Sequence, residues 1–306
     1  MLKQISFLIL CAVAIVLFTA PVQACTSAVV SGKVTPDGRP LLWKNRDTDF
    51  MRNHIDYVKG EKYNFIAVVN SANAYLKEAW MGTNSSGFAL MNTQSYNLVD
   101  VKGDEERGAA NGRVIYRALE VCATVEDFCH FLDTISKPSD IEANFGVIDA
   151  QGGAAMFEVD YHKYVMYDAN NPKDAPYGYI ARTNFSFAGK VNEGAGYVRY
   201  MEADQVLMKA SATGSITPQS IFNDLSRSFR NRMLDIDLRS GAYNRPQASG
   251  WFVDQDFIPR SSTSCSVVVQ GVKPGEKAEL TTMWTLLGYP PTGIAVPLWV
   301  KDAGKL

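Results

Sequence analysis

The feature that most constrains the fold is the order of short strand-like segments interrupted by two pairs of helical segments. β-Branched and apolar runs bounded by Gly, Pro, Asn or Asp predict strands. Amphipathic periodicity predicts one helix pair over 113–121 and 124–135, and a second over 197–208 and 217–229. Strand-rich blocks that flank paired helices indicate sheets covered by helices, an α+β layered architecture. The predicted strands are 26–30, 41–43, 65–70, 88–93, 145–149, 155–160, 165–168, 179–183, 264–270 and 280–286.

The first 24 residues have the layout of a secretory signal peptide. Lys3 provides a positive charge, residues 5–20 are almost wholly apolar, and Val22 and Ala24 place small residues at positions −3 and −1 of a cleavage site. The apolar run is shorter than the roughly 18 residues of a membrane-spanning helix. We therefore expect a secreted or periplasmic mature chain without stable membrane insertion, folded as a single domain over residues 25–306.

Charge and composition exclude several classes of partner. Thirty basic and 32 acidic residues are mixed along the chain, so no strong field is expected to hold nucleic acid. His54, His130 and His162 have no metal-ligand spacing, and no phosphate-binding loop is present, so we expect neither a metal nor a cofactor. Cys122 and Cys129 either pair across a helix-to-helix turn or remain free thiols. The oligomeric state, a homo-oligomer included, stays open.

Cys25 is the residue with the clearest chemistry, because it follows the predicted cleavage site directly. After cleavage it would carry a thiol and a free α-amine, and an α-amine with a pKa of about 7.7–8.0 accepts a proton near neutral pH. One residue would then supply both nucleophile and general base. Two alternatives stay open: Cys25 only marks the start of the mature chain, or it anchors a lipidated binding protein. Residues 22–24 lack the Leu usually found three residues before a lipidated Cys.

Motifs downstream of Cys25 favour the catalytic interpretation. They are CTSAVV at 25–30, DG at 37–38, LLWKNRD at 41–47, GTNSSGFA at 82–89, ARTN at 181–184 and WTLLGYP at 284–290. Their order resembles the N-terminal-nucleophile hydrolases that act on linear amide C–N bonds. This group includes choloylglycine hydrolases, penicillin V acylases, acid ceramidase relatives and acyltransferases that cleave isopenicillin N. Dipeptidases of the same superfamily are similar to the chain nearly as closely.

The resemblance implies roles for residues around the nucleophile. Asp47 would orient the terminal amine or thiol, with Asp49 as the reserve candidate in a shifted register. Asn184 matches a donor that stabilises the oxyanion of the tetrahedral intermediate. Asn92 would be the second donor, and Thr93 takes its place if one gap moves. These assignments make Cys25, Asp47, Asn92 and Asn184 the predicted catalytic residues.

Substrate contacts are assigned in the same way. Lys44 stands where the family has an Arg, and Arg46 lies two residues further along the same strand. A late Arg of choloylglycine hydrolases is replaced here by Cys265, which argues against bile-salt specificity. Arg260, close to that position, is the third predicted substrate-binding residue.

Fold and reaction follow from the resemblance together. The group has an αββα sandwich of two antiparallel sheets between helical layers, which agrees with the order of the predicted elements. The implied activity is hydrolysis of a linear amide in a small-molecule substrate through a thioester acyl-enzyme on Cys25. A dipeptidase or an acyltransferase would use the same residues with a different pocket. The acyl group and the leaving amine are not determined by the sequence.

Overall fold

Strand β2 (Leu41–Asp47) lies at the centre of the molecule, and its side chains alternate between two apolar layers. Leu42 and Trp43 are both fully buried. Leu42 belongs to the apolar cluster between the two sheets, whereas Trp43 belongs to the cluster between one sheet and its helices. A strand that is buried on both faces requires a layer on each side. The computed structural model describes residues 24–99, 108–240 and 256–304.

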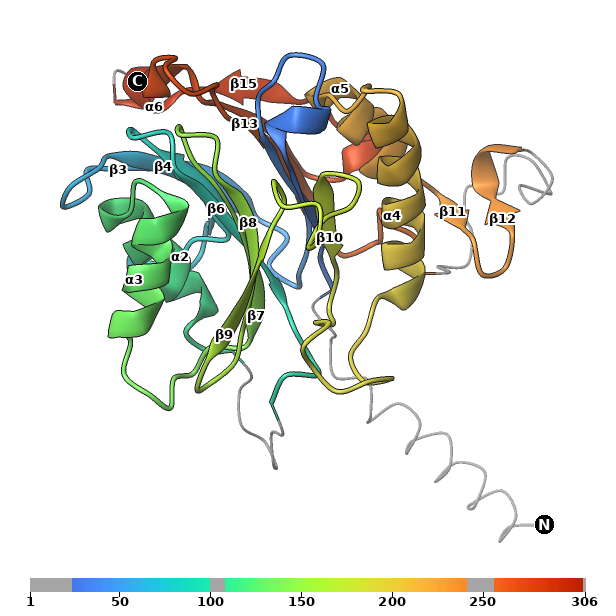
Figure 1. Cartoon of the computed structure of the whole chain (residues 1–306), viewed down its shortest axis with the longest axis horizontal. Helices are drawn as coiled ribbons and strands as arrows, with labels where there is room; N and C mark the ends of the chain where they lie inside the picture. The colour runs from blue at the N-terminus through green and yellow to red at the C-terminus, as the bar shows by residue number, and fades with distance from the viewer. Residues whose placement is uncertain (1–23, 100–107, 241–255, 305–306) are drawn as a thin grey trace, which may run out of the picture.

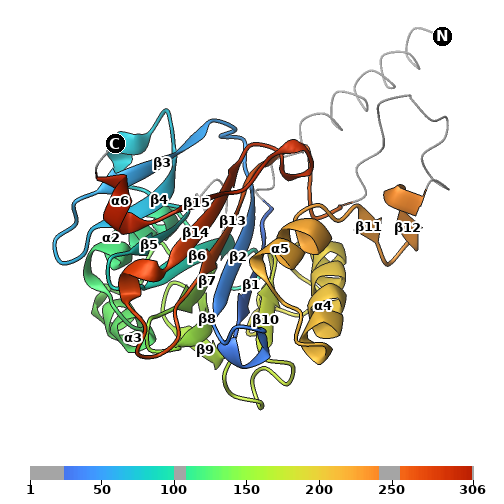
Figure 2. The ribbon, with the colours of Figure 1, turned by 90° about the horizontal axis from the view of Figure 1, so that it is seen from above.

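Two antiparallel sheets form the middle layers (Figures 1 and 2). The six-stranded sheet has the order β10-β1-β2-β13-β14-β15, and the seven-stranded sheet runs in sequence order from β3 to β9. Strands of the first sheet are β10 (Tyr179–Arg182), β1 (Thr26–Val30), β2, β13 (Thr263–Gln270), β14 (Thr282–Leu287) and β15 (Val296–Leu298). Strands of the second are β3 (Asn53–Val58), β4 (Phe65–Asn70), β5 (Met81–Asn84), β6 (Ala89–Gln94), β7 (Ala143–Ile148), β8 (Ala154–Val159) and β9 (Tyr164–Asp168).

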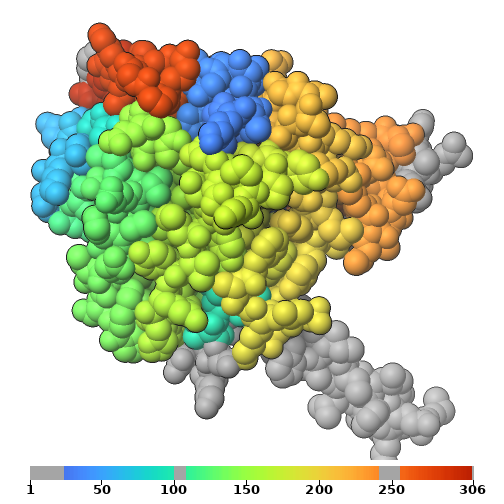
Figure 3. Space-filling model, viewed as in Figure 1, coloured from blue at the N-terminus to red at the C-terminus, as the bar shows by residue number. Residues whose placement is uncertain are grey.

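Helices cover the outer face of each sheet. Helices α2 (Asn111–Val121) and α3 (Val125–Thr134) pack on the seven-stranded sheet, and α4 (Tyr197–Ala212) and α5 (Pro218–Ser220) pack on the six-stranded sheet. Figure 2 shows the two helical layers on opposite sides of the paired sheets. In the space-filling view the surface continues from the layer of α2 and α3, across the region of β8, β9 and β10, to the layer of α4 and α5 (Figure 3). The chain therefore has the αββα arrangement that the sequence predicts.

The contact between the two sheets depends on a glycine. Gly146 on β7 faces the six-stranded sheet, and a Cβ there would lie 2.3 Å from Met91 Cε and 2.8 Å from side-chain atoms of Leu42 and Val29. Such distances are far below van der Waals contact, so any larger residue here would displace side chains packed between the sheets. Leu42 lies on β2 and Val29 on β1, the strands that lead to Cys25.

The helix predictions agree with the structure in part. Helix α3 begins after Thr124, whose side chain forms a capping box with Asp127. Helix α5 does begin at Pro218 behind the predicted N-cap Thr217, but the helical backbone changes to wider turns over Ile221–Leu225. The segment then enters the short strand β11 (Arg230–Asn231), which pairs with β12 (Ile236–Asp237). The prediction of one helix over 217–229 is therefore wrong at its C-terminal end.

Several strand segments lie outside the predicted ranges. The strand predicted over 41–43 continues to Asp47, and the predicted strands do not include β3 or β5. The added part of β2 is polar, β5 has only four residues and contains Gly82, and the side chains of β3 are only half-buried. Segments that are polar, short or half-buried give a weak strand pattern, and these are held by pairing with neighbouring strands. The smaller final helix α6 (Val300–Ala303) closes the chain.

Other expectations concern segments at the limits of the described chain. The predicted signal peptide falls almost wholly on residues 1–23, which are outside the described residues. Cys122 and Cys129 are free thiols, which decides against the disulfide between them. Among the residues that the structure describes, no helix is both long and apolar enough to cross a membrane.

Candidate functional site

Cys25 lies directly before β1 and lines a cavity of about 450 Å³. Its side chain is buried, with 6% of the residue exposed. Its Sγ donates a long hydrogen bond of 3.9 Å to the backbone oxygen of Asp47. Antiparallel pairing of Thr26 with Asn45 brings the beginning of β1 beside the end of β2. The thiol and the LLWKNRD motif are therefore neighbours because of strand register.

Both sheets and the start of α2 contribute to the cavity. Lys44, Arg46 and Asp47 come from β2, and Asn92 and Gln94 come from β6 of the opposite sheet. The wall is mostly polar, while Phe50 and Leu76 add exposed apolar side chains. The other lining residues are Asn70, Asn73, Glu78, Trp80, Tyr96, Gly108, Ala109, Asn111 and Arg113.

Asp47 is a buried carboxyl group with one unused oxygen. Only 1% of the residue is exposed, and its Oδ1 accepts a hydrogen bond of 2.5 Å from Thr263 Oγ1. Its Oδ2 has no hydrogen-bond partner within the described residues. Burial raises the pKa of Asp47 to about 7, and the positive charge of Arg199 and the Thr263 hydrogen bond oppose that rise. Such a carboxyl can accept a further hydrogen bond or a proton near neutral pH.

Lys44 is a buried cation that lines the same cavity. Its Nζ donates to Asn92 Oδ1 at 2.9 Å and to the backbone oxygen of Trp80 at 3.0 Å. Burial lowers the pKa of Lys44 to about 8, and the adjacent Cys25 thiol acts in the opposite direction. Because Asn92 accepts through Oδ1, its amide NH₂ remains as the group that can donate into the cavity.

Arg46 is the second buried cation. It donates to Asn53 Oδ1 and, at 2.8 Å, to Asn70 Oδ1, and its guanidinium lies 4.7 Å from the centre of the Trp80 ring. Burial lowers its pKa. Within the described parts of the chain, neither Arg46 nor Lys44 forms an ion pair with a carboxylate. Amide and carbonyl oxygens therefore solvate the two cations, and the Asp47 carboxyl acts on them without a direct ion pair.

Two predicted site residues lie outside the cavity lining. Asn184 is fully buried; its Nδ2 donates to Gln94 O at 2.8 Å and its Oδ1 accepts from Arg199 at 2.9 Å. Arg260 points to Asp256, with its Nη1 3.4 Å from the carboxylate. Their proposed roles as oxyanion donor and substrate ligand stay predictions, and the geometry does not place Arg260 in the cavity wall.

The reserve candidates are placed less favourably. Asp49 is exposed and does not line the cavity. Thr93 does not line the cavity either, and its Oγ1 accepts a hydrogen bond from Asn144 Nδ2 at 3.1 Å. The structure thus gathers Cys25, Asp47 and Asn92 at one cavity.

Sequence reasoning missed Arg199 and Trp80. Arg199 lies in an amphipathic helix, where an Arg is ordinarily exposed, yet its side chain is fully buried against Cys25 and Asn184. Nothing in the local pattern separates it from a surface residue. Trp80 follows the segment 71–79, which carries no strand or helix signal, and a lone aromatic residue there gives no indication of a pocket wall.

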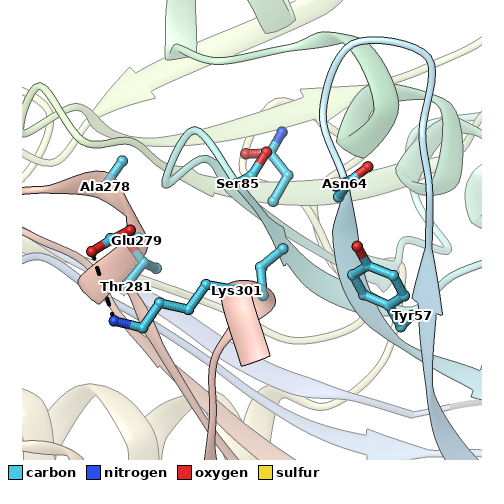
Figure 4. Close-up of a pocket in the computed structure, with 9 residues that line it drawn as sticks. Tyr57, Asn64, Ser85, Ala278, Glu279, Thr281 and Lys301 are labelled. Carbon is cyan, nitrogen blue, oxygen red and sulfur yellow. Dashed lines mark ion pairs between the residues drawn. The ribbon is translucent and has the colours of Figure 1, made fainter. Parts of the chain in front are cut away.

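A second, smaller cleft contains no comparable chemistry. It measures about 240 Å³ and lies between the segment that precedes β14 and the C-terminal helix α6 on one side and Tyr57 and Asn64 on the other (Figure 4). Glu279 and Lys301 form an ion pair of 3.7 Å in it, and Ser85 and Thr281 contribute hydroxyl groups. Neither cysteine nor histidine is among the described residues that line it. Across the described ranges, no group of three or more His, Cys, Asp or Glu side chains gathers as a metal site would require.

Comparison with solved structures identifies the fold. A conjugated bile acid hydrolase variant from Clostridium perfringens matches with a TM-score of 0.52 and 13% identity, over 89% of this chain and 92% of that one. Penicillin V acylase from Agrobacterium tumefaciens matches at 15% identity over 90% of this chain and 86% of its own, with a TM-score of 0.46. A Caenorhabditis elegans ortholog of N-acylethanolamine-hydrolyzing acid amidase matches at 16% sequence identity. The match covers 66% of this chain and 89% of that one, with a TM-score of 0.44.

Sequence comparison identifies the family. The search of curated proteins found no significant match to this chain. A family model matches residues 34–222, which is more than half of the chain and includes β2, β6 and β10. The chain belongs to the acyl-coenzyme A:6-aminopenicillanic acid acyl-transferase family, within the N-terminal-nucleophile hydrolases of linear amides.

Proposed function

We propose that this protein cleaves a linear amide through a thioester on Cys25, after removal of residues 1–24 exposes the α-amine of that residue. Membership of the family supports an enzyme of amide hydrolysis or acyl transfer. The observation that carries the finer proposal is the Cys25 thiol in a polar cavity, beside a buried Asp47 whose Oδ2 has no partner among the described residues. A carboxylate oxygen that receives no hydrogen bond is suited to accept one from the N–H of the newly exposed α-amine.

The reaction divides into two steps. Cys25 Sγ attacks the amide carbonyl carbon while its proton passes to the α-amine, which then protonates the leaving nitrogen as the C–N bond breaks. The acyl group remains on sulfur as a thioester, and the amine product departs. Water then attacks the thioester and gives a proton to the α-amine. As the C–S bond breaks, the resulting α-ammonium returns that proton to Sγ, and the carboxylic acid is released. In both steps the NH₂ of Asn92, which lines the cavity, would donate to the oxyanion.

The cavity also indicates the class of substrate. Lys44 and Arg46 are buried cations that no carboxylate pairs with in the described structure, and burying a charge without a counterion is costly. A substrate carboxylate close to the scissile amide would supply that counterion. Phe50 and Leu76 on the cavity wall provide an apolar surface for an acyl chain. We therefore propose N-acylated amino acids or related acyl amides with an acidic group.

Acyl transfer is the second candidate, because the matching family is described as an acyl-transferase that uses acyl-coenzyme A and 6-aminopenicillanic acid. The thioester is common to both reactions, and only the group that attacks it differs. Adding an amine such as 6-aminopenicillanic acid to the hydrolysis assay separates the two. An acyl-transferase would form the amide product at the expense of the free acid.

The decisive experiment combines intact mass with turnover. Secreted protein should begin at Cys25 without a mass increment, and it should release the amine from N-acyl amino acids. Cys25→Ser should lower kcat by at least about 10³-fold, and a chain with one extra residue before Cys25 should be equally inactive, because its nitrogen is an amide. Cys129→Ser, at a half-buried thiol outside the cavity, is the matched control and should retain full activity. A diacylglyceryl mass increment, or full activity of the extended chain, would refute the proposal.

A further inference from the structure

Arg199 is a buried arginine beside the candidate nucleophile, and its guanidinium hydrogen-bonds to several segments of the chain. It lies in the first turn of α4, and its side chain is fully buried. Its Nη1 donates to the backbone oxygen of Cys25 at 2.6 Å and to Thr26 Oγ1 at 2.9 Å. Its Nη2 donates to Asn184 Oδ1 at 2.9 Å, and its Nε to Asp256 Oδ1 at 2.9 Å. One planar guanidinium thus joins α4 to the start of β1 and to the end of β10.

The chain is shaped locally for this contact. Gly196, directly before α4, has a φ of 85°, a conformation that favours glycine. A Cβ at Gly196 would lie 2.3 Å from Arg199 Nη2 and 2.9 Å from its Cζ. The glycine therefore serves two requirements, the left-handed turn into the helix and the space for the guanidinium.

We propose that Arg199 is a positioning residue for the nucleophile: its guanidinium holds the Cys25 backbone and the Asn184 amide in place. Its positive charge also acts on the neighbouring Asp47 carboxyl. The inference rests on Cys25 as the proposed nucleophile. Arg199 contacts the Cys25 backbone rather than the thiol and does not line the cavity, so it acts through the groups that it holds. A lysine could keep the charge but not the three-sided fork, because an ammonium presents a compact point charge.

The electrostatic part concerns Asp47 most directly. Arg199 is the main charge that opposes the rise in the pKa of the buried Asp47 carboxyl. Asp256 acts in the opposite direction on that pKa, although it also accepts the Nε hydrogen bond of Arg199. Groups that act on or face Asp47 are Arg199 from α4, Asp256 and Arg260 from the segment before β13, Thr263 from β13, Lys44 and Arg46 from β2, and Cys25 before β1.

The test measures the reactivity of Cys25 as a function of pH, independently of any amide substrate. Mature protein is alkylated with iodoacetamide, and the labelled peptide is identified by mass. Kinetics of amide cleavage and thermal unfolding are recorded on the same samples. Removal of a cation raises the pKa of every nearby acid, so Arg199→Gln should move the acid limb of the alkylation profile upward by about one pH unit. Arg199→Lys should leave that limb in place but lower the plateau rate and kcat about tenfold, with little change in KM.

Two further variants separate positioning from stability. Asp256→Asn removes an anion and should move the acid limb downward, the opposite direction to Arg199→Gln. Because Asp256 is partly exposed, this variant tests the proposal even if substitution of Arg199 prevents folding. Arg182→Lys is the matched control: it is another buried arginine, ion-paired with Glu158 at 2.6 Å, and within the described residues it has no hydrogen bond to Cys25 or Asn184. It should lower the melting temperature and leave the limb unchanged.

The outcomes are distinct. If the Arg199 and Asp256 variants lose only melting temperature while limb and plateau stay at their wild-type values, Arg199 has a structural role alone and the inference is refuted. If the wild-type protein is alkylated at Cys25 but cleaves no amide, the proposed function fails. The alkylation profiles still decide the role of Arg199 in that case.

Discussion

Replacement of Asp47 by asparagine should make the protein more stable at alkaline pH while removing its activity. In the structure the carboxyl is fully buried with an oxygen that has no partner in the described chain, and its pKa is raised from 3.8 to about 7. A raised carboxyl pKa favours folding below the unfolded value, where both states are protonated, and that contribution is lost as pH rises through the folded value. Three pH units at about 1.36 kcal/mol each give about 4 kcal/mol.

The Asp47→Asn side chain would keep the hydrogen bond from Thr263 but place an NH₂ where Oδ2 has no partner in the described residues. That group costs about 1–3 kcal/mol at every pH. The free energy of unfolding of Asp47→Asn relative to the unsubstituted chain should therefore rise by up to about 4 kcal/mol between about pH 4 and pH 8. Urea unfolding at intervals across this range measures it. The form to use keeps Ala24 before Cys25, because Cys25 is then linked through an amide as in the structure.

The mature chain provides the internal comparison. Its free α-ammonium would lower the pKa of Asp47, so the pH-dependent difference between the unsubstituted and Asp47→Asn chains should become smaller. Turnover should fall about 10²–10⁴-fold in Asp47→Asn, the range typical of a lost acid–base partner. A stability difference that is the same at every pH would refute the argument that Asp47 is a carboxyl destabilised by burial.

Other predictions concern the cavity and the sheet contact. Lys44 has a pKa of about 8 and is charged below that pH, so KM for an acidic substrate should rise as pH increases through 8. Lys44→Arg should extend tight substrate binding to higher pH. The same pH dependence of KM in this variant and the wild type would exclude Lys44 as the ligand of the substrate anion. Asn92→Ala should lower kcat about 10²–10³-fold at constant melting temperature. Asn184→Ala should also lower the melting temperature, because both ends of the Asn184 amide are hydrogen-bonded. Equal kcat in wild type and Asn92→Ala would remove Asn92 from the oxyanion site. Gly146→Ala should cost about 1–3 kcal/mol by forcing the sheets apart, and normal stability by calorimetry would show that this contact relaxes freely.

The roles of individual site residues could be predicted unevenly, and the reason is how local each signal is. Cys25 and Asp47 belong to motifs along one hairpin, so their neighbourhood follows from the pairing of β1 with β2. Asn92 comes from the other sheet, and only the packing of the two sheets brings it to Lys44. Asn184 also belongs to a motif, yet its amide is turned toward Gln94 and Arg199 rather than into the cavity. A motif identifies the residue type but not the direction of its side chain.

The sequence by itself determined that helices cover sheets, most of the strands, and which residue to propose as the nucleophile. Apolar alternation and helical periodicity record burial, and burial is what a strand or a helix face must satisfy locally. Only the tertiary structure decided that Arg199 is buried against Cys25, that Asp47 has an unused oxygen, and that Lys44 and Arg46 share a cavity without a carboxylate partner in the described residues. These properties depend on which groups from distant segments lie within hydrogen-bonding distance and on how far water is excluded. The pKa of a titratable group and its hydrogen-bond partners depend on these three-dimensional surroundings, which no local pattern of residues encodes.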